Sequence, residues 1–279
     1  MASAKKTPLL GVTMGDPAGI GPEVILKAAA ALAGKQDSPA LVIIGDLDAM
    51  RETARRLRGN LPQLCEWHAG EGCFDTARGL PVLKVGKLAP SSTRPGHPTR
   101  AGATAAFGYV CEGARMALRG ELDGLVTAPI NKEWLNRAGH HFPGHSELLA
   151  EIAGARRWRM MFVGRQLRVA LVTVHVGLAR VPRMLTRSTV FDTIRLLADH
   201  LRSQLSIARP RIVVLGFNPH AGENGLFGDE ELKVIAPAVR RAQGVGIDAS
   251  GRLRRIPHSS ATGGTSVSMA PSRCITTRD

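Results

Sequence analysis

Residues 9–32 read LLGVTMGDPAGIGPEVILKAAAAL, and this stretch decides the fold class. Its apolar start at 9–14 leads into the glycine-rich segment 15–22, and a helix-like apolar pattern then runs to Leu32. Short apolar runs bounded by Gly and Pro are typical of buried strands, and Pro22 suits the first position of a helix. The stretch therefore predicts a strand, a tight turn and a helix.

The same alternation continues along the chain. Apolar runs predict further strands at 40–44, 122–127, 167–174 and 211–216. Amphipathic segments predict helices at 22–32, 100–118, 189–205 and 229–243. Because strands and helices alternate, the sequence indicates an α/β fold with a mostly parallel sheet.

The length of 279 residues permits one long α/β unit or two lobes. We expect a first α/β lobe at 1–126 and a second at 127–250 that carries the substrate and metal residues. Residues 90–98 predict a surface loop or a crossover between lobes. Residues 251–279 read GRLRRIPHSSATGGTSVSMAPSRCITTRD. The apolar residues in this segment follow neither a helical nor a strand period, which predicts a disordered tail.

The net charge of +14 raises the question of a nucleic-acid partner. The basic residues are scattered, however, and aromatic residues make up only 4%, so no stacking platform for bases is indicated. Solvated surface explains most of the charge, and a substrate carrying phosphate and carboxylate would also favour a positive cleft. We expect no nucleic-acid partner.

The cysteines and the apolar runs bear on location. Cys65, Cys73, Cys111 and Cys274 show no CxxC spacing, and the N-terminus lacks the pattern of a signal peptide. No apolar run approaches the roughly 20 residues needed to cross a bilayer. We therefore expect reduced thiols, a cytoplasmic location and no membrane partner.

Several segments at predicted strand ends can carry chemistry. The turn at 15–22 lets the backbone approach a ligand and points a helix N-terminus at an anion, or it is a tight turn and nothing more. Lys132 follows the strand at 122–127, although a solvated lysine is the commoner case. His145 can hydrogen-bond a phosphate or carboxylate, and so can Ser146, which is also placed to cap the next helix.

Two histidines point to a metal. His175 and His220 each follow an apolar strand, in LVTVH and GFNPH, so a parallel sheet brings both imidazoles to one edge. A divalent cation there would lower the pKa of a substrate hydroxyl. Two ligands do not make a complete site, and a strand-end histidine is more often a hydrogen-bonded structural residue.

Taken together, these segments resemble the 4-hydroxythreonine-4-phosphate dehydrogenase family of vitamin B6 biosynthesis, over roughly residues 8–250. The matching stretches are GVTMGDPAGIGPEV at 11–24, TAPINKEWLNRAGHHFPGHSELLAE at 127–151, LRVALVTVH at 167–175 and GFNPHAGENGLFGDEELKVIAPAV at 216–239. Each motif alone is weak, and the combination in this order is specific.

The resemblance implies a two-lobed α/β/α fold similar to isocitrate and isopropylmalate dehydrogenases, and a homodimer with active sites near the subunit interface. It implies that NAD (or NADP), with a divalent metal (Zn, Mg or Co), oxidises the 3-hydroxyl of 4-phosphooxy-L-threonine. The 2-amino-3-oxo acid phosphate then loses carbon dioxide. Threonate or erythronate 4-phosphate are the alternative substrates.

The resemblance also implies residue roles. His145 and Ser146 would bind the substrate, with Ser146 replacing the more usual threonine. His175 and His220 would be two of three metal ligands. Lys132 has a phosphate-binding or proton-transfer role only as a hypothesis, and no cofactor-binding residue is assigned.

After Ser250 the sequence departs from the family, so the C-terminal part of the fold, with its third metal-binding histidine, is expected to be missing. His258 stands in a different context. With a suitable choice of codons, residues 273–279 can be encoded as CGA TGC ATC ACG ACC AGG GAC. A shifted frame of this string reads Met-His-His-Asp-Gln-Gly, which contains the His-Asp-Gln-Gly of the family's Tyr-His-Asp-Gln-Gly-like segment. A frameshift is therefore one hypothesis, and a truncated, catalytically dead remnant is the alternative to an active enzyme.

Overall fold

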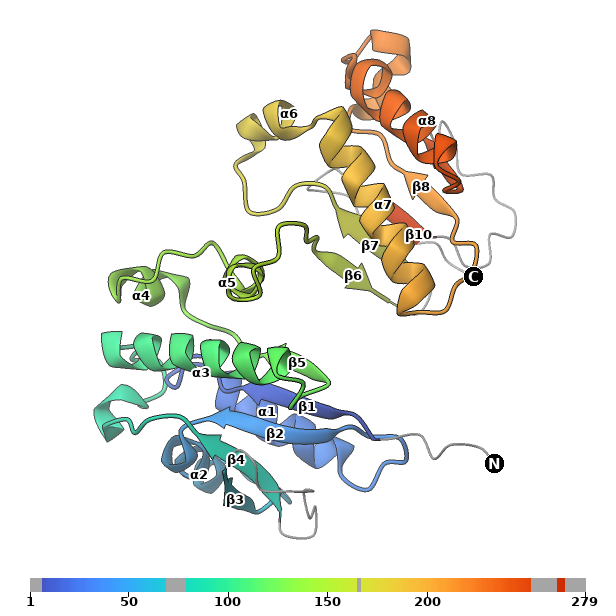
Figure 1. Ribbon diagram of the computed structural model, residues 1–279. Helices are drawn as coiled ribbons and strands as arrows, with labels where there is room; N and C mark the ends of the chain where they lie inside the picture. Colours follow the sequence, from blue (N-terminus) through green and yellow to red (C-terminus); the bar gives the residue numbers. More distant parts are fainter. Residues whose placement is uncertain (1–6, 69–78, 165–166, 252–264, 269–279) are drawn as a thin grey trace, which may run out of the picture. The chain divides into compact units, whose positions relative to one another are not determined.

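The computed structural model describes residues 7–68, 79–164, 167–251 and 265–268. The chain forms two compact units, Met1–Ala155 and Arg156–Asp279, which we call the N-terminal unit and the C-terminal unit (Figure 1). The predicted α/β fold class with parallel sheets is confirmed. The division at 155/156 differs from the expected lobe boundary at 126/127. The reason is local packing: helices α4 (Lys132–Arg137) and α5 (His145–Ile152) lie against α3 (Arg100–Leu118).

Within the described residues, the N-terminal unit contains a five-stranded parallel sheet in the order β3-β4-β2-β1-β5. Its strands are β1 (Leu9–Thr13), β2 (Ala40–Gly45), β3 (Leu64–Trp67), β4 (Leu80–Lys84) and β5 (Gly124–Thr127). The chain moves from β1 toward β3 and then returns across the sheet to β5. The strand order therefore reverses between β1 and β5, and ligands of open α/β sheets bind beyond the carboxyl ends at such a reversal.

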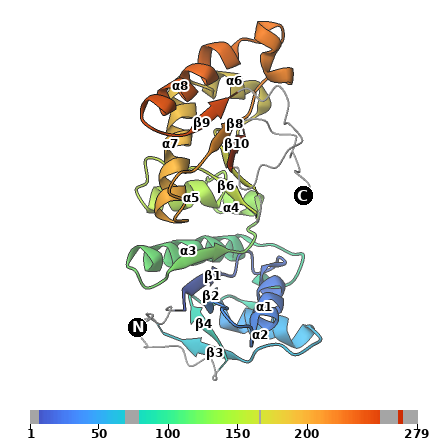
Figure 2. The same ribbon diagram turned by 90° about the vertical axis from the view of Figure 1, so that its right-hand side faces the viewer.

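Helices cover both faces of this sheet. Helix α1 (Gly21–Leu32) packs against α2 (Leu47–Arg56) on one face, and α3 lies on the other (Figure 2). Right-handed crossovers require this arrangement because the path from β1 to β2 and the return to β5 run in opposite directions. The core between the layers contains fully buried side chains, among them Met14, Ile43, Ile44, Met50 and Tyr109.

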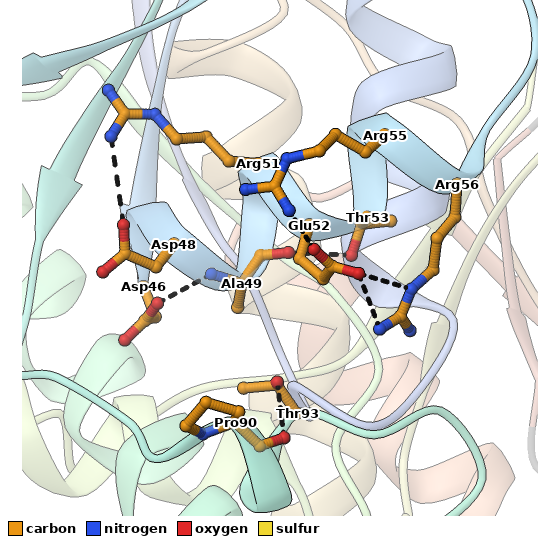
Figure 3. A network of polar contacts seen from close by, with 10 residues as sticks. All are labelled: Asp46, Asp48, Ala49, Arg51, Glu52, Thr53, Arg55, Arg56, Pro90 and Thr93. Atoms are coloured by element: carbon orange, nitrogen blue, oxygen red, sulfur yellow. Dashed lines mark hydrogen bonds and ion pairs between the residues drawn. The ribbon is translucent and has the colours of Figure 1, made fainter.

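The apolar pattern does not predict α2, and polar contacts explain why it begins where it does (Figure 3). The buried Asp46 carboxylate accepts the Ala49 N–H at 2.8 Å, which caps the helix, and the Leu88 N–H at 2.9 Å, which ties it to the segment after β4. Farther along α2, Glu52 pairs with Arg55 and Arg56. These pairs are exposed, so each contributes at most about 1 kcal/mol.

Within the described residues, the C-terminal unit contains a second five-stranded sheet, in the order β6-β7-β10-β8-β9. Its strands are β6 (Met161–Val163), β7 (Arg168–Leu171), β8 (Ile212–Val214), β9 (Ala249–Gly251) and β10 (Thr265–Ser268). Strand β6 is antiparallel to β7, and the other neighbours are parallel.

Helices α7 (Arg187–Ser203) and α8 (Ala236–Gly244) pack against each other over one face of this sheet (Figure 2). Both crossovers, from β7 to β8 and from β8 to β9, run in the same direction, so right-handedness puts both helices on the same side. The shorter elements are 3₁₀ helices at Pro90–Ser92, Leu178–Arg180 and Pro219–Gly225, α6 (Val181–Met184) and a π-helical turn at Glu231–Ile235.

Helix α3 has the predicted bounds because Thr99 caps it, accepting the Gly102 N–H at 3.0 Å. Helix α7 begins at Arg187, two residues earlier than predicted, because Thr186 caps it, accepting the Thr189 N–H at 3.1 Å. The strands predicted at 167–174 and 211–216 are shorter in the structure.

Cys65 and Cys111 are free thiols. Among the described residues, we find no helix with both the length and the hydropathy to cross a bilayer.

Strand β10 lies within 251–279, so the structure differs there from the predicted disordered tail. It pairs in parallel with β7, with Thr265 opposite Arg168, and with β8, with Thr265 opposite Ile212. A strand of four residues shows too few alternations to reveal a period of two in the sequence. Residues 252–264 and 269–279, with His258 and Cys274, lie outside the described residues, as does Cys73.

Candidate active site

The glycine-rich turn after β1 is held by three hydrogen bonds, two within the turn and one to Pro129. The Asp16 N–H donates to the Pro129 carbonyl at 3.0 Å, the Gly19 N–H donates to the Asp16 carbonyl at 2.9 Å, and the Asp16 carboxylate accepts the Ala18 N–H at 3.0 Å. Gly15 has φ 72°, and a Cβ there would lie 2.4 Å from the Pro129 carbonyl oxygen, so glycine is required. These amides face protein acceptors, which favours the interpretation as a tight turn over an anion cradle.

Lys132 follows the loop that this turn holds. Asn131 caps α4, since its Oδ1 accepts the Trp134 N–H at 3.1 Å, and Lys132 is therefore the first residue of the helix. The lysine is exposed. It stands just past the carboxyl end of β5, beside the reversal of strand order, where an ammonium group can attract an anionic ligand.

His145 begins α5, with Gly144 at the cap position. Its Nε2 is buried and has no hydrogen-bond partner among the described residues. Burial lowers the pKa of His145, and the positive charge of Lys132 lowers that pKa further, so the imidazole is neutral at pH 7. The structure therefore places Lys132 and His145 within electrostatic reach of each other.

Ser146 is the second residue of α5, so the prediction that it caps the helix is wrong. The helix begins two residues earlier than a cap at Ser146 would imply, and no side chain caps it. The half-buried hydroxyl lies in the first turn, where backbone N–H groups lack helical partners and the helix dipole favours negative charge.

Aromatic contacts fix the segment that leads into His145. The His140 ring stacks on Phe107 of α3 with centroids 3.8 Å apart, and the Phe142 ring lies 6.0 Å from the same phenylalanine. Pairs of this kind add about 0.5–1.5 kcal/mol beyond the area that they bury. The sequence does not reveal either contact, because both join residues more than thirty positions apart and no local pattern indicates such a pair.

His175 and His220 lie at the carboxyl edge of the C-terminal sheet. Both are exposed, and both have φ 53°, in the left-handed region. Strands β7 and β8, which lead into them, each run parallel to β10, which lies between them. The two loops therefore leave the sheet at the same edge, from strands roughly 10 Å apart.

The donor types at this edge fit a divalent cation, since neutral imidazoles are good ligands. Among the side chains that the structure describes, however, no group of three His, Cys, Asp or Glu could hold a metal ion. His175 and His220 can therefore provide only part of a metal site. A third ligand has to come from elsewhere.

The turn that carries His220 is strained. Residues His220 to Asn224 have φ of 53°, 54°, 77°, 43° and 59°, although only Gly222 among them is a glycine. Left-handed backbone costs roughly 1–2 kcal/mol for each residue with a Cβ. Sustained strain of this kind is found at functional sites. The sequence carried a weak signal, because His and Asn adopt this conformation more readily than most residues.

Comparison with known proteins agrees with the motifs. Residues 37–255 match the model of the family described as Pyridoxal phosphate biosynthetic protein PdxA. A 4-hydroxythreonine-4-phosphate dehydrogenase of Geobacter metallireducens is 45% identical over 251 residues, covering 88% of this chain and 72% of that protein. A protein of Symbiobacterium thermophilum, provisionally named D-threonate 4-phosphate dehydrogenase, is 41% identical over 252 residues with the same coverage, 88% and 72%.

The fold points the same way. The crystal structure of 4-hydroxythreonine-4-phosphate dehydrogenase from Klebsiella pneumoniae matches with a TM-score of 0.77 at 36% identity, covering 88% of this chain and 75% of that one. The family model, the sequence relatives and the solved structure are therefore consistent with the order of motifs along the chain. The chain belongs to the PdxA family of pyridoxal phosphate biosynthetic proteins and is, by that membership, a dehydrogenase.

Proposed function

We propose that this chain oxidises the 3-hydroxyl of 4-phosphooxy-L-threonine with NAD or NADP and a divalent metal. The hydroxyl proton is released and the hydrogen on the same carbon leaves as hydride, which gives 2-amino-3-oxo-4-phosphooxybutanoate. A 3-oxo acid loses carbon dioxide readily, and the product is then 3-amino-2-oxopropyl phosphate. The family membership supports this reaction, and a homodimer is the assembly that we expect to carry it out.

The observation that carries the proposal is the buried Nε2 of His145. A buried polar atom without a partner is costly, and native structures seldom keep one without a reason. The substrate has a phosphate, a carboxylate and a hydroxyl, each of which can hydrogen-bond an imidazole. Lys132, exposed and within electrostatic reach, would attract the anionic groups, and the Ser146 hydroxyl in the first turn of α5 offers a further contact.

We assign His175 and His220 as metal ligands in this proposal. A bound divalent cation would lower the pKa of the substrate hydroxyl and so favour its deprotonation. The contribution of the chain itself is to hold two imidazoles at one sheet edge in backbone conformations that keep them exposed. An oxidised nicotinamide would accept the hydride.

The direct test is NADH formation from 4-phosphooxy-L-threonine with added Zn²⁺, Mg²⁺ or Co²⁺, followed by absorbance. Because the described side chains provide only two of the three metal ligands, we expect weak turnover that a chelator abolishes. Failure with every metal and with both NAD and NADP would contradict the proposal.

The role of His145 is tested by His145→Ala beside His141→Ala. Both histidines lie in the same segment, but His141 is exposed and contacts the Asn136 side chain at 2.9 Å. We expect His145→Ala to lower kcat/KM roughly ten- to hundredfold through lost substrate contacts, and His141→Ala to have little effect. Equal losses in the two variants would remove His145 from the substrate site.

A second candidate activity is dehydrogenation of D-threonate 4-phosphate, which the name of the Symbiobacterium thermophilum relative favours. The two substrates differ at carbon 2, where one has an amino group and the other a hydroxyl. Comparing kcat/KM for both decides between them. A higher value for threonate 4-phosphate would replace the first proposal with the second.

A further inference from the structure

The His220 turn depends on a carboxylate that lies outside it. Glu231 begins the π-helical turn after this loop and is only 2% exposed. Its Oε1 accepts the Phe217 N–H at 2.8 Å and the Asn218 N–H at 2.7 Å, and its Oε2 accepts an Asn218 side-chain N–H at 2.9 Å. One side chain thus holds the two residues that lead into Pro219 and His220.

Glu231 also contacts the middle of the turn. A Cβ on Gly222 would lie 2.7 Å from Glu231 Oε2, so the carboxylate fills the space that a side chain would need. The carboxylate therefore binds the extended backbone of Asn218 before His220 and lies close to the left-handed Gly222 after it.

The burial of the Glu231 carboxyl group needs an explanation. Among the residues that the structure describes, no lysine, arginine or histidine forms an ion pair with it, so the hydrogen bonds from the turn are what satisfy this buried polar group. An apolar side chain at this position would avoid the free-energy cost of removing a carboxyl group from water. The arrangement is explained if the carboxylate is kept because it orders the backbone that it binds.

We propose that Glu231 is the positioning residue of the His220 turn: its buried carboxylate holds the left-handed backbone that presents the His220 imidazole to a divalent cation. The cation-binding part rests on the proposed function. The hold on the backbone rests on the contacts above alone, and the two parts are tested separately.

The first test is amide hydrogen exchange on the full chain without metal, in wild type and in Glu231→Ala. We expect exchange across 216–228 to rise at least about tenfold, because hydrogen bonds to charged groups support a factor of that size. Exchange in β7 and α7 should stay unchanged. An unchanged rate across 216–228, or an equal rise throughout the C-terminal unit, would overturn the inference.

A conservative variant separates the hold on the turn from simple folding. In Glu231→Gln, one side-chain oxygen can still accept the Phe217 and Asn218 N–H groups, while the NH₂ group faces the Asn218 amide and loses that bond. We expect protection of these two backbone amides to return toward the wild-type level. Asp199→Asn, which removes an exposed carboxylate on α7, is the control for charge and should match wild type.

The second test measures Co²⁺ affinity by calorimetry in wild type, His220→Ala and Glu231→Ala. We expect Glu231→Ala to weaken binding roughly ten- to hundredfold, the loss typical when a residue that orients a metal ligand is removed. If His220→Ala loses Co²⁺ and Glu231→Ala binds it normally, the proposed function stands and the inference is wrong. If wild type binds no Co²⁺, the metal role of His220 is wrong, and hydrogen exchange alone decides whether Glu231 holds the turn.

Discussion

The turns after β1 and β8 are each built around one buried carboxylate, but the two carboxylates come from different places. Asp16 lies inside its own turn and accepts the N–H of Ala18, two residues on. Glu231 lies outside its turn and accepts N–H groups from Phe217 and Asn218, 14 and 13 residues back. Positive φ is limited to Gly15 in the first turn, whereas the second contains five successive left-handed residues.

This difference separates a structural turn from a candidate functional one. In the turn after β1, two hydrogen bonds to Asp16 are made within the turn, and a third joins the Asp16 N–H to the Pro129 carbonyl in the same unit. The strained turn is held by the side chain of Glu231, which lies outside it, and it is the turn that exposes a histidine. Both segments are rich in glycine, so composition alone does not distinguish them.

The largest effect on stability is expected in the turn after β1. Gly15→Ala would place a methyl group 2.4 Å from the Pro129 carbonyl oxygen and 3.0 Å from Ala128 backbone atoms, at φ 72°. The backbone of Ala128 and Pro129 cannot yield easily, so we expect the N-terminal unit to lose about 3 kcal/mol of unfolding free energy. Urea unfolding followed by Trp67 and Trp134 fluorescence, which both report on this unit, measures the loss.

Gly108→Ala is the matched control in the same unit. A Cβ on this glycine of α3 would meet no atom within 4 Å, so alanine should stabilise the helix by about 0.5–1 kcal/mol. Opposite signs for the two variants would support the account of the first turn. A loss below about 1 kcal/mol for Gly15→Ala would show that the turn relaxes, and the comparison with the second turn would then break down.

A smaller effect is expected in the strained turn. Gly222→Ala would place a methyl group 2.7 Å from Glu231 Oε2 and 2.9 Å from the Gly228 carbonyl oxygen. Because a side-chain carboxylate can shift and Ala221 already tolerates positive φ, we expect a loss of about 2 kcal/mol. Unfolding of the C-terminal unit, followed by Trp158 fluorescence, measures it. Gly177→Ala, at a site with no atom within 4 Å, should change stability little.

The smallest effect is a pH dependence in the N-terminal unit. The pKa of His145 is lowered in the folded chain, by burial first and by Lys132 second, from an ordinary value of 6.5. A lowered pKa means that the folded state binds the proton less well than the unfolded state does. The resulting stability is present above pH 6.5 and is lost as the pH falls through the folded-state pKa.

His145→Gln should therefore flatten the pH dependence of unfolding of this unit below pH 6.5. Unfolding midpoints in urea across the acidic range provide the measurement. An unchanged slope in the variant would mean that His145 is not the group that titrates.

The sequence predicts those parts of the fold that local signals define. Strand β1, helix α1 and helix α3 follow from apolar runs, Pro22 and the Thr99 cap, all of which act within a few residues. The apolar periodicity does not reveal helix α2, because the exposed face of this helix is highly charged and its start depends on Asp46. The strand order of the C-terminal sheet cannot be predicted from the sequence either, because β10 lies between β7 and β8 and comes from a segment without a visible apolar period.

The candidate site divides in the same way. His175 and His220 were identified because each follows an apolar strand, and the structure places both at one sheet edge. The left-handed turn and its support by Glu231 could not be predicted, because the contact spans 13 residues and Glu231 is one of three consecutive acidic residues with no distinguishing mark.

The position of β1 also affects how the protein is made. Leu9 and Asp123, 114 residues apart, join the edges of β1 and β5 through the Leu9 N–H and the Asp123 carboxylate at 2.7 Å. At roughly 5–20 residues per second of synthesis, on the order of 6–25 s pass between the synthesis of β1 and that of its neighbour β5. During that time an apolar strand has one edge unpaired. Chaperone demand on the nascent chain should therefore peak before residue 127 emerges and fall after it.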